Sequence, residues 1–449
     1  MNKRIIKTVA AALAASGLSA TALPQQQASG LAFTYTAGIQ VQNLSNAQAT
    51  IVITFYNPDG TQAGTTNDTI PANGSKTYFP LSAVSAGFDG SAIISADQQV
   101  AAIVNVLGNN GVAGAAYSGS PVGSPTVDLP LLMKNNFGFN TWFKVQNAGN
   151  TATNITVNYS DGTSASATNV QPGASAIFDQ SLEAHNAAVF AATVTSNNNQ
   201  PLVAAVIEES SSVMFAYSGF ASGSTNPVMP LVNANNFGYI TGIQIKNGGS
   251  SASSVTVTYT RSSAPFDSCT ETRTIQAGQS ETFALYAFSV AGTTSSNCPF
   301  GQTFVGSARV TANSANVPLT VIVNQLNNSQ GTGEAYGGFD PAQATSKVVM
   351  PLIMDRNFGY FTGFNVMNIG TAATNVTCTF TNSSRTVTAS LNPGQALTDV
   401  QLNQLGNGYV GSATCTGGAG SKLAGVVNEL NNDPPPSDKF LVYEAISTN

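Results

Sequence analysis

A twelve-residue stretch recurs through the chain, and its spacing limits what the chain can fold into. It runs from Asn236 to Asn247, and close copies run from Asn136 to Asn147 and from Asn357 to Asn368. A diverged copy runs from Phe33 to Asn43. The terminal asparagines of successive copies are 104, 100 and 121 residues apart, which is the length of a small domain. The sequence therefore predicts a tandem array of four repeats.

Within each repeat, apolar and polar residues alternate with the period of half-buried β-strands. In the recurring stretch, Phe143 and Val145 alternate with Lys144 and Gln146. The next segment, Asn154 to Tyr159, alternates in the same way, and turn residues follow it. About seven short strands in about 100 residues predict an all-β chain in which each repeat is an antiparallel, immunoglobulin-like β-sandwich.

The repeat spacing sets the predicted domain boundaries. Each boundary lies at a proline-leucine segment, namely Pro130-Leu131, Pro230-Leu231 and Pro351-Leu352. Because proline fixes one backbone angle and restricts the residue before it, we expect stiff joints whose apolar residues pack on a neighbouring domain. The predicted divisions are a signal peptide at 1–22 and sandwich repeats at 23–126, 127–227, 228–348 and 349–449, the third of which carries loop insertions.

The first residues have the pattern of a secretory signal peptide. Lys3, Arg4 and Lys7 precede an apolar run from Thr8 to Leu18 that is too short to span a bilayer. The small residues Ala20-Thr21-Ala22 follow, so we expect cleavage after Ala22 and a secreted protein, extracellular or on the cell surface. No later stretch of the sequence is long and apolar enough to predict a membrane-spanning helix.

Charged residues are scarce and mostly acidic. They make up 8% of the chain, against roughly 25% in average soluble proteins. Without the predicted leader, 12 basic and 21 acidic residues remain, a net charge near −9. This balance argues against nucleic acid or anionic lipid as a partner. It also predicts a polar surface that other copies can approach with little repulsion.

Four cysteines fit an oxidising destination and allow three pairings. Only pairing within repeats avoids crossing a domain boundary, and it predicts Cys269–Cys298 and Cys378–Cys415. Cys378 and Cys415 occupy inward positions of two strands, so their bridge is expected to pin these strands through the core, as in immunoglobulin-type domains. Cys269 and Cys298 lie in loop insertions, so their bridge is expected to staple two loops.

Residues for catalysis or metal binding are few. His185 is the only histidine and is interpreted as an exposed loop residue. The acidic pair Glu208-Glu209 could serve acid/base chemistry, but the other repeats carry asparagine at the position of Glu208, which favours a structural role. Metal binding would need histidines or a CxxC pair. We therefore predict no catalytic, cofactor or metal residues, and expect that the protein is not an enzyme.

Aromatic residues recur at matching places in the repeats. Recurrence favours core or interdomain packing, and the alternative is stacking on sugars or contact between subunits. A tryptophan occurs once, and an exposed one would indicate a sugar-binding site or an interface. The candidate interface aromatics are Phe137, Trp142, Phe237, Tyr239, Phe358 and Tyr360.

The general plan is a cleaved leader followed by tandem immunoglobulin-like sandwiches rich in Thr, Asn and Gly. It resembles bacterial cell-surface and extracellular repeat proteins of the surface-layer, sheath and adhesin-stalk type. The resemblance covers the whole mature chain and is one of plan, with no diagnostic motif. It implies a non-catalytic structural protein that self-associates into a coat or filament. The alternative is an adhesin or binder of cell-surface glycans that uses domain-end loops such as Thr293 to Thr303.

Overall fold

A computed structural model describes residues 31–262, 267–284, 297–298, 301–327, 329–431 and 438–448, and the backbone of residues 6–10. All regular elements among these residues are β-strands, and all strand pairs are antiparallel. None of the described residues forms a helix with the length and hydrophobicity needed to cross a membrane. The chain divides into two compact units, Met1–Ala221 (unit 1) and Ser222–Asn449 (unit 2).

Unit 1 contains the first two repeats. The strands of the first repeat are β1 (Ile6–Ala10), β2 (Tyr35–Asn43), β3 (Ala49–Tyr56), β4 (Gln62–Ile70), β5 (Ser75–Tyr78), β6 (Ser91–Ala96), β7 (Val100–Gly108) and β8 (Ala113–Ser118). Those of the second are β9 (Thr126–Met133), β10 (Asn140–Asn147), β11 (Thr153–Tyr159), β12 (Ser164–Val170), β13 (Ser175–Asp179), β14 (Val189–Ser196), β15 (Leu202–Glu209) and β16 (Met214–Ser218).

Unit 2 contains the third and fourth repeats. The strands of the third are β17 (Val228–Ala234), β18 (Ile240–Asn247), β19 (Ser253–Arg261), β20 (Ser268–Ile275), β21 (Ser280–Phe283), β22 (Phe304–Ala312), β23 (Leu319–Asn327) and β24 (Thr332–Gly337). Those of the fourth are β25 (Lys347–Asp355), β26 (Tyr360–Asn368), β27 (Thr374–Phe380), β28 (Thr386–Leu391), β29 (Ala396–Val400), β30 (Tyr409–Thr416), β31 (Leu423–Asn431), β32 (Leu441–Glu444) and β33 (Ile446–Thr448).

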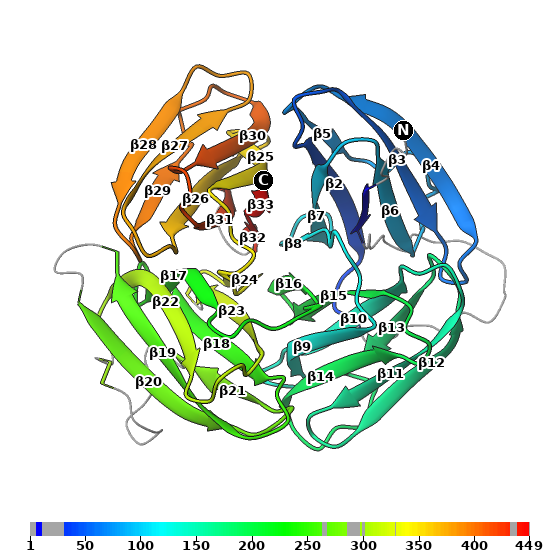
Figure 1. The fold of residues 1–449 in the computed structure, drawn as a ribbon. Helices are drawn as coiled ribbons and strands as arrows, with labels where there is room; N and C mark the ends of the chain where they lie inside the picture. The colour runs from blue at the N-terminus through cyan, green and yellow to red at the C-terminus, as the bar shows by residue number, and fades with distance from the viewer. Residues whose placement is uncertain are drawn as a thin grey trace. The chain divides into compact units, whose positions relative to one another are not determined.

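Every repeat arranges its strands into two sheets with the same order (Figure 1). In the second repeat these sheets are β13-β10-β15-β16 and β12-β11-β14-β9. The third repeat matches them with β21-β18-β23-β24 and β20-β19-β22-β17, and the fourth adds only β33 beside β25. The predicted repeat is therefore visible as a repeated sheet topology.

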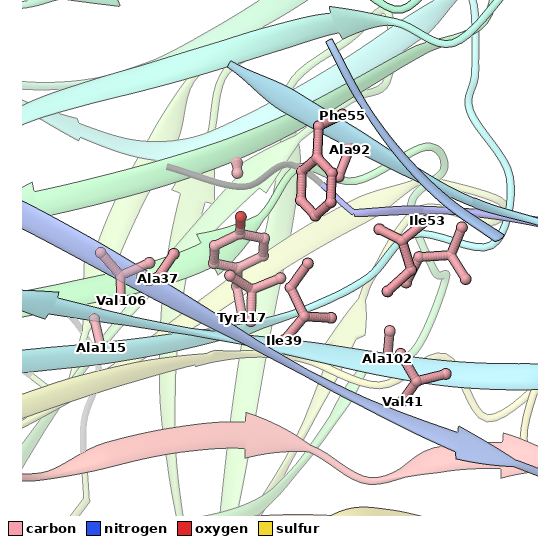
Figure 2. Packing of buried hydrophobic residues seen from close by; sticks show 14 of the residues in the cluster. Ala37, Ile39, Val41, Ile53, Phe55, Ala92, Ala102, Val106, Ala115 and Tyr117 are labelled. Carbon is pink, nitrogen blue, oxygen red and sulfur yellow. The ribbon is translucent and has the colours of Figure 1, made fainter. Parts of the chain in front are cut away.

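The alternating pattern of the sequence corresponds to alternating burial in the β12-β11-β14-β9 sheet, for example in β11. In β11, Ile155, Val157 and Tyr159 are buried, whereas Asn154 and Asn158 are exposed. The inward residues of the two sheets in a repeat lie in one apolar cluster, as Figure 2 shows for side chains of β2, β3, β6, β7 and β8. The predicted half-buried strand is confirmed for these elements.

Strands β10 and β15 of the other sheet depart from that pattern because the first repeat covers their second face. Lys144 and Gln146 of β10 were expected on a wet face, yet both are buried. The Lys144 ammonium pairs with Asp89 of the first repeat. On β15, Ala205 and Ile207 belong to the apolar cluster of the first repeat. Strands β10 and β15 are thus buried on both faces, and this fits the nearly continuous apolar sequence of β15 from Leu202 to Ile207.

Unit 2 repeats this arrangement. The cluster of the third repeat includes Val426, Phe440 and Val442 from the fourth. Two backbone amides of β24 also donate to acidic side chains of the fourth repeat: Gly333 N to Asp438 Oδ1 at 3.0 Å, and Gly337 N to Glu444 Oε1 at 2.6 Å. Each unit is therefore a pair of repeats joined through apolar and polar contacts.

The proline-leucine segments lie inside strands and are not separate joints, which corrects that part of the sequence expectation. The expected packing on a neighbouring repeat is seen at Val228, which shares a cluster with Met367, Ile369 and Ala424. Pro130, Pro230 and Pro351 lie inside β9, β17 and β25. Each of these strands pairs with the sheet of its own repeat, and the register shifts beside the proline. Proline cannot donate a ladder hydrogen bond, so a bulge is the place where a strand accommodates it.

The predicted leader overlaps one described element. β1 pairs with β6, with Ala10 opposite Ala92 and Ile6 opposite Ala96. This is the position that β9, β17 and β25 take in the other repeats. Residues 1–5 and 11–30, which include the predicted cleavage site, lie outside the described residues. Cleavage after Ala22 stays a prediction.

The asparagine that ends each recurring stretch is buried, and its side chain joins a turn to a neighbouring strand end; we call it the latch asparagine. Asn147 Nδ2 donates to the carbonyls of Thr151 and Val170 at 2.8 and 2.9 Å, and its Oδ1 accepts from Gly149 N at 2.9 Å. The corresponding bonds recur at Asn247 and Asn368. The side chain thereby satisfies backbone groups of a turn and of the strand end beside it, which accounts for its recurrence.

Candidate functional site

The most unusual side chains are phenylalanines at the tips of three tight turns. In the second repeat, Asn136 and Phe139 exchange two backbone hydrogen bonds of 3.0 Å around Phe137-Gly138. Phe137 has φ of 51° and Gly138 has φ of 86°. Positive φ at both central residues is the geometry of a type I′ turn, whose first central position favours Asn, Asp or Gly. A bulky residue there is strained.

The same turn occurs in both repeats of unit 2. Phe237 and Phe358 have φ of 49° and 50°, and each is followed by a glycine at φ of 86° or 83°. The three phenylalanine side chains are almost fully exposed, with relative accessibilities of 86% for Phe137, 90% for Phe237 and 93% for Phe358. The expectation of core or interdomain packing is wrong for these three residues.

Two of these turns are held in place by asparagine side chains. Asn327 Nδ2 donates to the carbonyl of Phe237 at 3.0 Å, and Asn431 Nδ2 donates to the carbonyl of Phe358 at 3.4 Å. Gly238 has φ of 86°, which favours glycine, and a Cβ there would lie 2.8 Å from Asn327 Oδ1 and would displace the amide that bonds the turn. The turns therefore present their aromatic rings on a fixed backbone.

The other candidate aromatics pack inside the units. Trp142 is only 2% exposed and meets Tyr35 of the first repeat edge to face, with ring centroids 5.3 Å apart. Tyr239 meets Phe440 of the fourth repeat at 5.4 Å. Tyr360 is half-buried at the start of β26. Tyr239 therefore packs between repeats as expected, whereas Trp142 is not the exposed tryptophan that would indicate a sugar-binding site.

Both predicted disulfides are present, with geometry that corrects two details. Cys378 and Cys415 are direct partners on the neighbouring strands β27 and β30, with Cα atoms 4.0 Å apart. Their bridge therefore lies within one sheet and does not join two sheets through the core. Cys269 lies on β20 and bridges to Cys298 across 5.0 Å between Cα atoms, so this bridge ties a strand, and not a loop, to the inserted segment.

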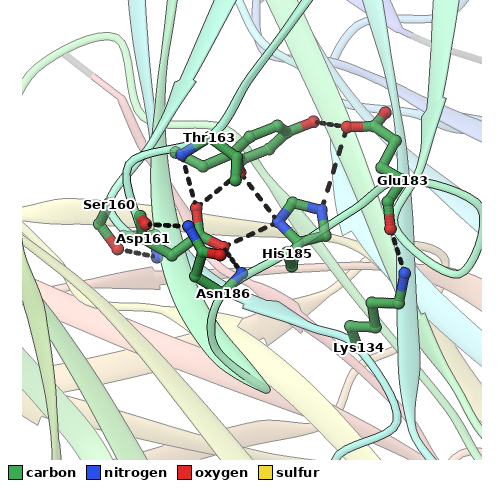
Figure 3. A network of polar contacts seen from close by, with 9 residues as sticks. Lys134, Ser160, Asp161, Thr163, Glu183, His185 and Asn186 are labelled. Atoms are coloured by element: carbon green, nitrogen blue, oxygen red, sulfur yellow. Dashed lines mark hydrogen bonds and ion pairs between the residues drawn. The ribbon is translucent and has the colours of Figure 1, made fainter.

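His185 is buried in a polar cluster, contrary to the expectation of an exposed residue (Figure 3). Its Nδ1 lies 3.1 Å from Asp161 Oδ2 and 3.2 Å from Thr163 Oγ1. Its Nε2 lies 4.0 Å from Glu183 Oε2, which accepts a 2.6 Å hydrogen bond from Tyr159. The imidazole also stacks on Phe190, with ring centroids 4.1 Å apart.

The electrostatics of this cluster favour a structural role. Burial lowers the pKa of His185 below its ordinary value, although Asp161 opposes the shift. Hydrogen bonds from Thr163 and Asn186 outweigh burial and lower the pKa of Asp161 to about 2. Thr163 Oγ1 and Asp161 Oδ2 both contact the same imidazole nitrogen, His185 Nδ1. A nucleophile, base and orienting acid in series would need both ring nitrogens engaged.

Glu209 of the acidic pair on β15 links the first two repeats. Glu209 accepts hydrogen bonds from the hydroxyl of Tyr35 and from Ala32 N, the latter at 2.7 Å. Burial raises the pKa of Glu209, partly offset by these donors. Glu208 is fully buried beside it. The contacts of Glu209 between repeats support its structural interpretation.

One groove of about 1190 Å³ lies within unit 1, between β12, β13 and loops of the first repeat. Serine, threonine and asparagine side chains of β12 line it, together with Phe88 and Phe178. Both rings are buried, so they offer no free face on which a sugar could stack. Among the described residues, no group of three or more His, Cys, Asp or Glu side chains is placed to hold a metal ion.

Comparison with protein-family models and with curated proteins finds no significant match for this chain. The three aromatic turns, defined as Asn136–Phe139, Asn236–Tyr239 and Asn357–Tyr360, are therefore the candidate functional site on geometry alone. The sequence analysis singled out their residues but assigned the recurring stretch to strands, so it missed the turns. The Phe-Gly pairs flanked by asparagine are the signal that could have indicated them. It also missed the exposure of the turns, which depends on how far each turn projects from the sheets.

Proposed function

We propose that this is a non-catalytic, secreted structural protein of the cell surface that self-associates into an extracellular coat or filament. The observation that carries the proposal is the set of three exposed phenylalanines held at positive φ. Each places an apolar ring in water on a strained backbone, and neither feature stabilises a lone molecule. Strained residues that persist in a fold support a functional hypothesis at that site.

A second copy of the chain is the partner that best explains these turns. Rings repeated at domain-length intervals give one molecule several weak contacts, and contacts made together reinforce one another. Aromatic residues are also enriched at the centres of protein interfaces. The low charge density, with 36 charged residues in 449, leaves little electrostatic repulsion between copies.

The architecture supports an extracellular setting. Two disulfides and no free cysteine among the described residues fit an oxidising compartment. We propose that each repeat is an immunoglobulin-like sandwich, because eight strands form two antiparallel sheets around a shared cluster. In this proposal four sandwiches are grouped as two pairs.

The test is a triple variant, Phe137→Asn, Phe237→Asn and Phe358→Asn, because asparagine suits positive φ and removes the ring. Sedimentation velocity and electron microscopy over a rising concentration series should show assembly of the native protein and its loss in the triple variant. The matched control is Val122→Asn with Leu182→Asn, which removes exposed apolar side chains elsewhere. Assembly by the triple variant equal to the native protein, or no assembly by the native protein, would contradict the proposal.

The alternative of glycan binding has no observation that favours it. Most of the loop from Thr293 to Thr303 lies outside the described residues. The groove in unit 1 lacks an exposed aromatic face. Loss of assembly in the triple variant would not be expected if the turns served only to bind sugars.

A further inference from the structure

One edge strand of unit 1 has backbone groups without a partner in its sheet. β12 lies at the end of that sheet and has only β11 as a strand neighbour. Tyr159 N donates to Thr163 O where the two strands begin to pair. Because backbone groups of an antiparallel strand point alternately to either side, those of Ser164 and Ser166 point away from β11. No hydrogen bond from another described segment reaches these groups.

This edge is accessible along its length. Each residue from Thr163 to Gln171 lines the groove of about 1190 Å³ in unit 1. Ser175 of β13 also lines it and is only 7% exposed, and its hydroxyl has no hydrogen-bond partner among the described residues. Since native proteins seldom leave a buried hydroxyl unpaired, Ser175 favours a polar group that enters the groove from outside.

The equivalent edges of the other repeats are charged. On this side of every repeat lie two edge strands, one in each sheet: β4 and β5, β12 and β13, β20 and β21, and β28 and β29. β28 contains no charge but begins directly after Arg385, which bonds to Asp399 of β29. β12 has no charged residue within it or directly beside it. The other six strands contain at least one each, namely Asp68, Lys76, Asp179, Glu271, Glu281 and Asp399.

Charge on an edge strand opposes pairing with another chain. In β20, Glu271 points inward and is fully buried, which is one way in which proteins protect an edge. In the first repeat, Asp68 of β4 pairs with Lys76 of β5 at 2.6 Å, so a salt bridge links the two edges. β12 has neither device, because it carries no charge. Of these eight edges, β12 is therefore the one most open to an added strand.

A second copy of the chain supplies a matching strand. A charged partner would find no counter-charge on β12, whereas another β12 is uncharged and brings the same open backbone groups. Antiparallel pairing of a strand with its own copy is two-fold symmetric, so both open edges gain partners at once and the contact closes. We propose that β12 of one molecule pairs antiparallel with β12 of a second molecule about a two-fold axis near Ser166. This pairing does not use the aromatic turns and goes beyond the proposed coat or filament.

The test uses the two-fold axis. Ser166 of one molecule lies near Ser166 of the other, so Ser166→Lys and Ser166→Glu each bring like charges together and weaken the dimer. An equimolar mixture brings opposite charges together and should dimerise about tenfold more tightly than either variant alone. All proteins are full chains that carry the triple phenylalanine substitution, which removes the aromatic contacts. Sedimentation equilibrium measures the dissociation constants.

The matched control is the same pair of changes at Thr388 of β28. Thr388 lies opposite Thr377, and Ser166 takes the same place in β12 opposite Thr156. Both substituted positions are exposed. Mixing Thr388→Lys with Thr388→Glu should bring no gain in affinity. Hydrogen exchange gives a second readout, because the Ser164 and Ser166 amides should exchange slowly in the dimer and faster in either charged variant at Ser166.

A triple phenylalanine variant that stays monomeric would overturn the proposal, and so would a dimer that neither substitution at Ser166 weakens. An equal gain on mixing the Thr388 variants would also overturn it, because the effect would then be general attraction between opposite charges. These outcomes do not decide the proposed function. The proposed function fails if the native chain forms nothing larger than this dimer, and the β12 pairing would then still stand.

Discussion

At the scale of single residues, the aromatic turns depart furthest from local preference. An Asn-Gly pair would form the same two-residue turn without strain, yet phenylalanine occupies the first position three times. The histidine cluster is the opposite case, because the His185 side chain is buried and its Nδ1 contacts Asp161 and Thr163 of the same repeat.

Replacing one turn phenylalanine should therefore stabilise the isolated molecule. We expect Phe358→Asn to raise the free energy of unfolding of unit 2 by about 0.5–1 kcal/mol, because asparagine tolerates positive φ. Denaturant titration of dilute protein measures the change. Val122→Asn, an exposed position in unit 1 that has no positive φ, should leave unit 2 unaltered. A destabilised Phe358→Asn would show that the ring serves the fold.

The buried histidine should make unit 1 sensitive to acid. Burial lowers the folded pKa of His185, so the unfolded chain binds a proton first as pH falls below about 6.5. The stability from neutral His185 is full above that pH and decreases as pH falls towards the folded pKa. Asp161 opposes this loss, as its own pKa of about 2 keeps it charged.

The measurement is the free energy of unfolding of unit 1 between pH 7 and pH 5, for the native protein and for His185→Gln. The stability advantage of the native protein should shrink as pH falls. Glu183, whose pKa is raised by burial, has the opposite pH dependence, and Lys134 binds the Glu183 carbonyl. Both residues are present in the two proteins, so the comparison isolates the histidine. A constant difference across this range would contradict the prediction.

At the scale of elements, the latch asparagines and the bulged proline-containing strands connect the strand ends within each repeat. Asn147 lies where β10 ends, and its side chain reaches the strand end at Val170 and the turn at Thr151. In the bulged strand β9, the carbonyl of Leu131 accepts a hydrogen bond from the hydroxyl of the buried Tyr217 on β16. These side chains form hydrogen bonds with backbone groups that have no partner within the sheets.

Removing one latch should be costly. We expect Asn147→Ala to lower the free energy of unfolding of unit 1 by about 2–3 kcal/mol, because two carbonyls and one amide lose their partner. Asn158→Ala on the exposed face of β11 is the matched control and should change stability by less than about 0.5 kcal/mol. If chemical denaturation shows equal effects of the two substitutions, the hydrogen bonds of Asn147 do not stabilise unit 1 as predicted.

At the scale of the whole molecule, repeats pair to give two units. Trp142, Ala205 and Ile207 link the first two repeats in one apolar cluster, and Val426 and Val442 do the same in unit 2. Repeats that share a core are expected to unfold together. The chain should therefore behave as two cooperative units.

Calorimetry should accordingly show two unfolding transitions. Both disulfides lie in unit 2, and unit 1 contains no cysteine. Reduction should lower only the transition of unit 2, by about 2–4 kcal/mol for each bridge. Unit 1 serves as the internal control in the same sample. A single transition, or a shift of both transitions on reduction, would contradict the two-unit description.

The sequence by itself determined the strands, the repeat period and the paired cysteines. Strand alternation is local because it depends on residues a few positions apart, and the repeat period and the cysteine pairing follow from spacings along the chain. Only the tertiary structure decided which strands are covered on both faces, as β10 is at Lys144 and Gln146. It also decided that the proline-leucine segments pair with the sheets of their own repeats. It also decided that His185 is buried and that Phe137 is exposed. Such outcomes depend on which repeats and loops meet in space, and a local pattern carries no record of those distant partners.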